Sequence, residues 1–86
     1  ICAGPITLGK LGITNGKNAT CYPGFEDQLE GCNYKEELVV VDGNIITSRG
    51  PATTLLFAYK IVDILGGDSE ALKEGMLWNK LEEEKQ

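Results

Sequence analysis

Apolar and polar positions are most regular in the middle of the chain. Residues 38–41 (LVVV) and 44–47 (NIIT) are two runs rich in β-branched side chains, and Asp42-Gly43 separates them. An Asp-Gly pair accepts the positive φ that a type I′ turn requires, so this pattern predicts a β-hairpin. The second strand is expected to end within residues 48–50.

A strongly apolar helix is predicted after the hairpin. Pro51 stands where a helix can start, because its missing N–H leaves no donor unpaired in the first turn, and Gly66-Gly67 is a typical helix end. The apolar residues between them form two adjoining stripes, one of Leu55, Ala58, Val62 and Leu65 and one of Phe57, Ile61 and Ile64. A helix that is apolar around most of its circumference is covered on more than one side. We therefore expect a sheet against one side and another layer or subunit against the other.

The remaining elements are shorter. In chain order, the sequence predicts a helix over 5–13, a turn at 14–16, a strand over 17–22, a short helix that begins at Pro23-Gly24 with Phe25 and Leu29 on one face, and a loop through Cys32 and Tyr34. A last helix over 70–78 follows a cap at Asp68-Ser69, and the charged tail 81–86 is expected to be solvated or frayed. This order of helices and strands is typical of an α/β layer architecture.

The length of the chain limits it to at most one small domain, since it has 86 residues. It begins with Ile1 rather than Met, and its predicted strands are too few to cover both faces of its helices. We therefore expect residues 1–86 to be the carboxy-terminal part of one domain, with an amino-terminal half outside this chain.

Composition and charge exclude several classes of function. A formal net charge of −5 argues against nucleic-acid binding, which needs clustered Lys and Arg. No run approaches the roughly 18 apolar residues of a membrane span. The 3 cysteines form neither a disulfide framework nor a CxxC zinc pair. We expect no metal or cofactor, no nucleic-acid or membrane partner, and a reducing, cytoplasmic location.

The candidate chemistry lies at the start of the chain, in residues 1–5 (ICAGP). Pro5 marks the first turn of a helix, so Cys2 is expected where that helix begins. Unpaired N–H groups and the helix dipole favour a thiolate there, which is one way in which a cysteine becomes nucleophilic. The alternative is that Cys2 is a small buried apolar residue, as most free cysteines are.

Four stretches together resemble the ThiJ/PfpI superfamily, and within it the branch of the Parkinson-disease-associated protein deglycase (DJ-one-like). They are residues 1–5 (ICAGP), 19–27 (ATCYPGFED), 39–51 (VVVDGNIITSRGP) and the apolar helix after Pro51. The resemblance covers roughly residues 1–66 and implies a flavodoxin-like three-layer sandwich, usually a homodimer. This chain would be the carboxy-terminal half of such a protein.

The resemblance also implies a site. Cys2 matches the cysteine that the family carries on a strained strand-to-helix turn, and the Ala3 N–H would help hold an oxyanion. The family's glutamate beside the thiol lies in the amino-terminal half, so no residue of this chain matches it. Tyr22 stands where many members carry a histidine; it could donate a hydrogen bond to a bound anion or carbonyl, but a tyrosine is a poor general base at neutral pH.

Other residues near this site have simpler explanations. Gly50 and Pro51 match the Ser-Arg-Gly-Pro motif of the family, which lies near the nucleophile and the dimer contact. A strand end followed by a helix that starts at proline also explains both residues fully. Arg49 could bind an anion, but an arginine at a strand end is more often solvated. Cys21 and Cys32 are expected to be mainly structural.

The resemblance implies a cysteine-dependent enzyme that acts on small reactive carbonyls, of the glutathione-independent glyoxalase or protein deglycase type, with Cys2 as nucleophile. A second hypothesis is an oxidative-stress sensor or redox-regulated chaperone without turnover, in which Cys2 is oxidised to sulfinate. A third is that this part of the chain has no activity alone.

Overall fold

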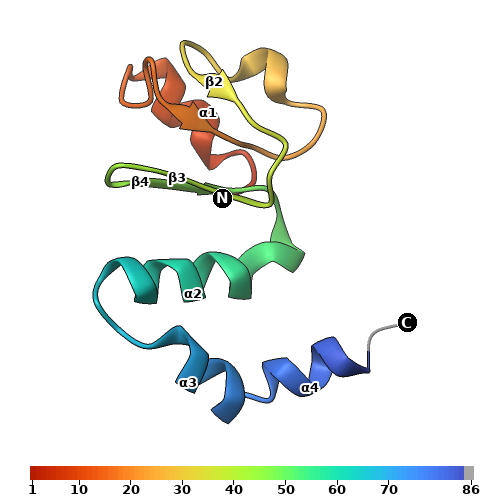
Figure 1. Cartoon of the computed structure of the whole chain (residues 1–86). Coiled ribbons are helices and arrows are strands. Elements are labelled where there is room, and N and C mark those ends of the chain that lie inside the picture. Colours follow the sequence, from red (N-terminus) through yellow and green to blue (C-terminus); the bar gives the residue numbers. More distant parts are fainter. Residues whose placement is uncertain (85–86) are drawn as a thin grey trace.

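The computed structural model describes residues 1–84. Its elements, in chain order, are α1 (Gly4–Lys10), β1 (Asn18–Ala19), the 3₁₀ helix η1 (Glu26–Gln28), β2 (Asn33–Tyr34), β3 (Val39–Asp42), β4 (Ile45–Ser48), the 3₁₀ helix η2 (Pro51–Thr53), α2 (Thr54–Ile64), α3 (Ser69–Gly75) and α4 (Trp78–Glu83). Figure 1 shows the β3–β4 hairpin in the middle, with α1, β1 and β2 on one side of it and α2, α3 and α4 on the other. Helices and strands therefore form the layers expected of an α/β protein.

The predicted hairpin is confirmed, with a shift of one residue in its turn. β3 and β4 pair antiparallel, with Val39 opposite Ser48 and Asp42 opposite Ile45. The connecting residues are thus Gly43 and Asn44 rather than Asp42 and Gly43. Gly43 has a φ of 61° and Asn44 does not have a positive φ. Positive φ at the first connecting position alone is the property of a type II′ turn, so the predicted type I′ turn is wrong.

The predicted strand over 17–22 is regular only at β1, and its partner is β2. Asn18 lies opposite Asn33 and Ala19 opposite Tyr34 in a parallel pair, whereas the sequence predicted a loop at Tyr34. Beyond Ala19 the regular backbone pairing ends, because the Thr20 N–H donates to a side chain, Thr47 Oγ1, at 2.9 Å. A hydrogen bond to a side chain 27 residues away leaves no pattern in the sequence around Thr20, so the end of the strand could not be predicted.

The segment after Pro23 is a single 3₁₀ turn instead of a short helix. Phe25 keeps 39% of its surface exposed, whereas Leu29 is buried at 7%. A 3₁₀ helix has three residues per turn, so side chains four apart do not share a face as they would in an α-helix. Leu29 packs with Ala19 and Cys21 into the buried apolar cluster of this half of the chain.

The helix after Pro51 begins and ends as predicted. Pro51 starts η2, which continues into α2. At the other end the Gly67 N–H donates to the Val62 carbonyl at 2.8 Å and the Gly66 N–H to the Asp63 carbonyl at 3.1 Å. This pair of bonds, with Gly66 at a φ of 90°, is a Schellman motif.

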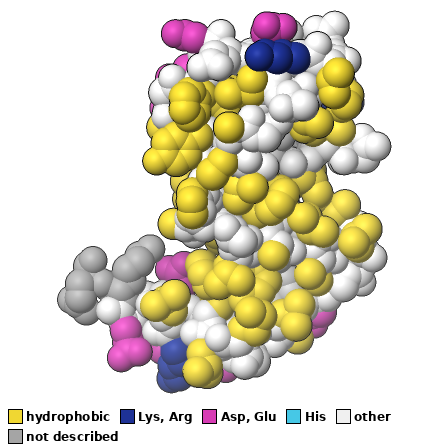
Figure 2. Space-filling view, turned by 180° about the vertical axis from the view of Figure 1, so that it is seen from behind, with side chains coloured by type: hydrophobic (Ala, Val, Ile, Leu, Met, Phe, Trp, Pro, Cys, Tyr) yellow, Lys and Arg dark blue, Asp and Glu magenta, His cyan; other side chains and the backbone are white. Residues whose placement is uncertain are grey.

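α2 packs most tightly through a residue outside the two predicted stripes, whereas Phe57, Ile61 and Val62 of those stripes are half-buried. Tyr59 is its most buried residue, with 4% of its surface exposed. Its ring lies 5.7 Å from that of Trp78 in an edge-to-face contact, and its hydroxyl donates to Met76 Sδ at 3.5 Å. By contrast Ile64 and Leu65 keep 45% and 81% of their surface exposed. Figure 2 shows apolar side chains spread over one face of the molecule, at the height of the hairpin and of the helices.

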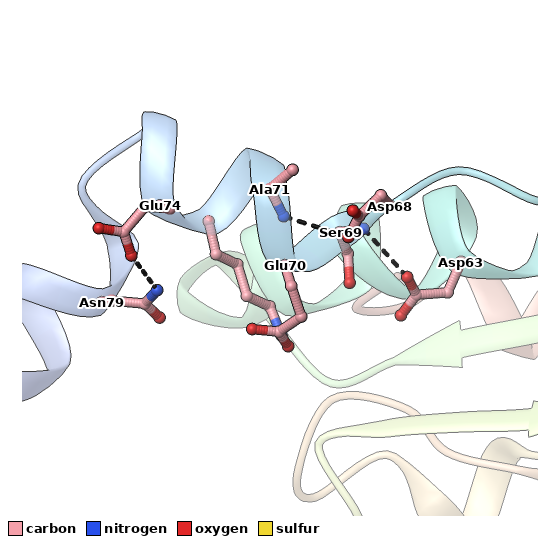
Figure 3. Close-up of polar contacts among 8 residues, drawn as sticks. Asp63, Asp68, Ser69, Glu70, Ala71, Glu74 and Asn79 are labelled. Carbon is pink, nitrogen blue, oxygen red and sulfur yellow. Dashed lines mark hydrogen bonds and ion pairs between the residues drawn. The ribbon is translucent and has the colours of Figure 1, made fainter.

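The predicted last helix over 70–78 is two helices. Asp68 caps α3 as expected, since its Oδ1 accepts from the Ala71 N–H at 3.2 Å (Figure 3). Leu77 then adopts a left-handed φ of 65°, which ends the first helix before α4 begins. The predicted solvated tail is helical through Glu83, and its last two residues lie outside the described part of the chain. Two contacts hold α4 against α2 and α3. Trp78 packs on the Tyr59 ring, and the Asn79 amide donates to Glu74 Oε2 at 2.9 Å.

None of the helices that the structure describes is both long and apolar enough to cross a membrane.

Candidate active site around Cys2

Both backbone groups of Cys2, its N–H and its carbonyl, make long-range hydrogen bonds. Its N–H donates to the Ser48 carbonyl at the end of β4, at 3.1 Å, and its own carbonyl accepts from the Tyr22 N–H at 3.0 Å. Its φ is 57°, in the left-handed region that non-glycine residues adopt only at a cost of about 1–3 kcal/mol. The two long-range hydrogen bonds therefore hold a strained turn, and the half-buried Cys2 lies on it.

The chain enters α1 directly from this turn, as the sequence predicted. Ala3 is the N-cap residue and Pro5 lies in the first turn. The Gly4 N–H donates to the Ile1 carbonyl at 3.0 Å. Among the residues that the structure describes, none accepts a hydrogen bond from the Ala3 N–H. An amide donor next to the cysteine is therefore available for a ligand.

Tyr22 connects the cysteine turn to the Gly50-Pro51 step. Besides its N–H bond to Cys2, its ring lies beside Gly50, where a Cβ would be 3.4 Å from two ring carbons. The ring also lies 6.0 Å from that of Phe25, and 44% of Tyr22 is exposed. The tyrosine thus presents an accessible edge next to the turn.

A pocket of about 300 Å³ opens beside this tyrosine. Tyr22, Pro23, Leu38 and residues 49–53 line it. Three of the five predicted site residues, Tyr22, Gly50 and Pro51, therefore line one pocket. Cys2 and Ala3 do not line it. Cys2 is joined to it through its backbone bond with Tyr22, which lines the pocket, and its other bond goes to Ser48, the residue before Arg49.

Arg49 is not the solvated side chain that the sequence predicted. Its Nε donates to the Cys21 carbonyl at 3.1 Å, its Nη2 donates to the Tyr34 hydroxyl, and its guanidinium lies 5.6 Å from the centre of the Tyr34 ring. Burial raises the pKa of Tyr34, and the charge of Arg49 partly offsets this. Arg49 thereby fixes the segment that leads into Tyr22. Sequence reasoning missed this role because it did not predict β2, the strand that carries Tyr34.

The other two cysteines lie in the apolar cluster. Cys21 has none of its surface exposed, and Cys32 packs against the same cluster. Burial raises the pKa of both thiols, and at Cys21 the charge of Glu26 adds to this effect. These surroundings disfavour the thiolate, which agrees with the structural role expected for both residues. Within residues 1–84, no group of three His, Cys, Asp or Glu side chains could hold a metal ion.

The geometry defines a class of protein: an α/β protein with a cysteine on a strained turn at the start of a helix. The model of the DJ-1/PfpI family matches residues 1–64. The chain belongs to the DJ-1/PfpI family.

Individual relatives agree with this family. The chain is 49% identical over 83 residues to "Protein DJ-1alpha" of Drosophila melanogaster, an alignment that covers 91% of this chain and 38% of that protein. It is 42% identical over 65 residues to "Glutathione-independent glyoxalase DJ-1" of Schizosaccharomyces pombe, with 73% and 34% covered.

A solved structure agrees as well. The crystal structure of Drosophila melanogaster DJ-1beta matches with a TM-score of 0.82 and 42% identity over 88% of this chain and 43% of that one. The predicted family and the predicted α/β fold are therefore confirmed. The chain spans less than half the length of each of these proteins.

Proposed function

We propose that Cys2 is the nucleophile of a cysteine-dependent enzyme that acts on small reactive carbonyls, of the glutathione-independent glyoxalase or protein deglycase type. The observation that carries the proposal is the strained Cys2 turn, held by two long-range hydrogen bonds beside an unpaired Ala3 N–H. Family membership and the name of the Schizosaccharomyces pombe relative, a glutathione-independent glyoxalase, support the substrate class.

The proposed reaction begins with addition to an aldehyde such as methylglyoxal. The Cys2 thiolate forms a C–S bond to the aldehyde carbon, and the electron pair of the C=O bond moves onto the oxygen. The Ala3 N–H donates to this oxyanion. The oxyanion takes up a proton, which gives a hemithioacetal. The proton shuttle then removes the proton of the former aldehyde carbon to give an enediolate, the hydroxyl proton passes to the oxygen of the neighbouring carbon, and the shuttle returns its proton to that carbon, so that a lactoyl thioester of Cys2 forms. Water hydrolyses this thioester to lactate, which restores the thiol. Tyr22 donates a hydrogen bond to a substrate oxygen.

The proton shuttle is proposed to come from outside this chain. Tyr22 is a poor base near neutral pH, and the chain has no histidine. The relatives are more than twice as long as the part that this chain matches, so there is room for the acidic partner, a glutamate in the family, in an amino-terminal half.

Two further parts of the proposal concern assembly and location. We propose a homodimer, supported by the apolar residues that α2 leaves exposed, among them Leu55 at 38% and Ile64 at 45%. We also propose a reducing, cytoplasmic location, supported by three cysteines that form no disulfide in the structure.

The test is to alkylate the intact protein with iodoacetamide from pH 5 to 9 and to map the modified cysteine. We expect Cys2 to react at pH 6 faster than a small thiol, and methylglyoxal turnover to disappear in Cys2→Ser. Cys32→Ser is the matched control, because Cys32 is also half-buried but lies in the apolar cluster, and it should retain turnover. Turnover that survives Cys2→Ser would refute the proposed role.

The second candidate function is an oxidative-stress sensor or redox-regulated chaperone. The half-buried thiol beside a free amide donor favours it as well, because that donor would stabilise a sulfinate as it would an oxyanion. Peroxide-dependent modification of Cys2 in a protein without methylglyoxal turnover would identify this function instead of the first.

A further inference from the structure

A buried pair of hydroxyl groups lies beneath the candidate site. Ser48 at the end of β4 has none of its surface exposed and Thr53 in η2 has 8% exposed. Their side-chain oxygens are 2.5 Å apart. Ser48 Oγ is also 2.9 Å from the Leu38 carbonyl, and Thr53 Oγ1 is 2.8 Å from the Gly50 carbonyl and accepts from the Gly50 N–H at 3.2 Å. The pair therefore connects the end of β4, the residue before β3 (Leu38) and the Gly50-Pro51 step to one another.

The same short segment touches the cysteine turn at two places. The Ser48 carbonyl is the acceptor that holds the Cys2 N–H at 3.1 Å. Gly50 lies against the Tyr22 ring, and Tyr22 in turn donates its N–H to the Cys2 carbonyl. Both backbone bonds of Cys2 thus lead back to the segment that the two hydroxyls fix.

A left-handed φ at a residue with a Cβ persists only where the surroundings determine it. If the Ser48 carbonyl were free to move, Cys2 could relax toward a negative φ. This relaxation would reorient the Cys2 side chain relative to the turn and to the start of α1. A displacement of about 1 Å at a reacting group can cost about 100-fold in rate.

We propose that Ser48 and Thr53 are positioning residues for Cys2: their hydroxyl pair locks the connection from β4 to α2, and the locked Ser48 carbonyl holds the cysteine turn in its strained conformation. Neither side chain touches the reacting atoms. The expected changes in alkylation and turnover rest on the proposed function, whereas the expected change in amide hydrogen exchange at Cys2 does not.

The test compares Thr53→Val, which keeps the shape and removes the hydroxyl, with Thr53→Ser, which restores it, in the intact protein. We expect Thr53→Val to slow iodoacetamide alkylation of Cys2 about 10-fold and to lower kcat for methylglyoxal about 10-fold, with KM changed less than about 2-fold. Amide hydrogen exchange of the Cys2 N–H should become about 10-fold faster. Thr53→Ser should return all three to wild-type values.

Thr54→Val is the matched control. Thr54 is the next residue and its hydroxyl donates to the Pro51 carbonyl at 2.6 Å, but Thr54 is exposed and its hydroxyl is not among the hydrogen-bond partners of Ser48 Oγ, which are Leu38 and Thr53. If Thr53→Val is folded and leaves alkylation and exchange unchanged, or if Thr54→Val has the same effect, the proposal is overturned. If Thr53→Val does not fold, Ser48→Ala takes its place in the same comparison.

The proposed function and the positioning role fail in different ways. A wild-type Cys2 that alkylates no faster than a small thiol would refute the nucleophile and leave the exchange measurement to decide the positioning role. A reactive wild-type Cys2 with unchanged exchange in Thr53→Val would refute the positioning role alone.

Discussion

Replacing Gly9 with alanine should destabilise the protein, although alanine is the better helix former. Gly9 is buried in α1 and faces the backbone of Glu30, where a Cβ would lie 2.9 Å from the carbonyl oxygen and 3.1 Å from the nitrogen. Backbone atoms cannot rotate away as the end of a side chain can. Either α1 or the loop at Glu30 must therefore move.

The magnitude follows from two opposing terms. Alanine in a helix interior is favoured over glycine by about 1 kcal/mol. Overpacking of a buried contact costs about 1–3 kcal/mol. Gly4→Ala in the same helix is the matched control, because a Cβ there has no atom within 4 Å. We expect the free energy of unfolding of Gly9→Ala to be about 1–3 kcal/mol lower than that of Gly4→Ala.

Urea denaturation followed by circular dichroism measures this difference, provided that the two variants have the same m-value. Alkylation of Cys2 should be measured in parallel, because α1 begins two residues after it. If Gly9→Ala is as stable as Gly4→Ala, then Glu30 does not press on the helix and this account of the α1 contact is wrong.

Three other predictions test charge, burial and packing. Hydrogen bonds from Ser69 lower the pKa of Asp63, so the stabilisation by its carboxylate is complete above pH of about 3.9 and is lost as the pH falls through the lower pKa of the folded state. The stability advantage of the wild type over Asp63→Asn should therefore shrink below that pH in acid titrations followed by circular dichroism, and an advantage that grows would contradict this. In the folded protein iodoacetamide should modify Cys21 last of the three cysteines, because Cys21 is fully buried and burial raises its pKa; peptide mapping that finds it modified first would refute this. Gly50→Val should displace the Tyr22 ring, because a Cβ at Gly50 is already 3.4 Å from that ring; KM for methylglyoxal should rise severalfold, and an unchanged KM would show that this wall does not bind substrate.

The features that the sequence determined depend on neighbours along the chain. A hairpin was predictable because two β-branched runs flank a short turn containing glycine, and the backbone preferences of a few residues decide it. The start of the helix at Pro51 and its end at Gly66-Gly67 follow from the same kind of preference. The cysteine before Gly-Pro likewise marked a helix start, and the structure has α1 there.

The features that only the tertiary structure decided depend on partners far away in the sequence. The parallel pair of β1 and β2 is too short to leave a pattern, and it brings Tyr34 to Arg49. Tyr59, which lies outside the predicted stripes, is the most buried residue of α2, because Trp78 supplies a ring to pack against.

The strain at Cys2 has the same origin. Its left-handed φ is unfavourable for the residue alone and is held by acceptor and donor groups at Ser48 and Tyr22. The sequence by itself determined where the cysteine turn lies, since the backbone preferences that start a helix depend on adjacent residues. Its conformation was decided by the fold, since hydrogen bonds between distant segments form only once those segments have come together.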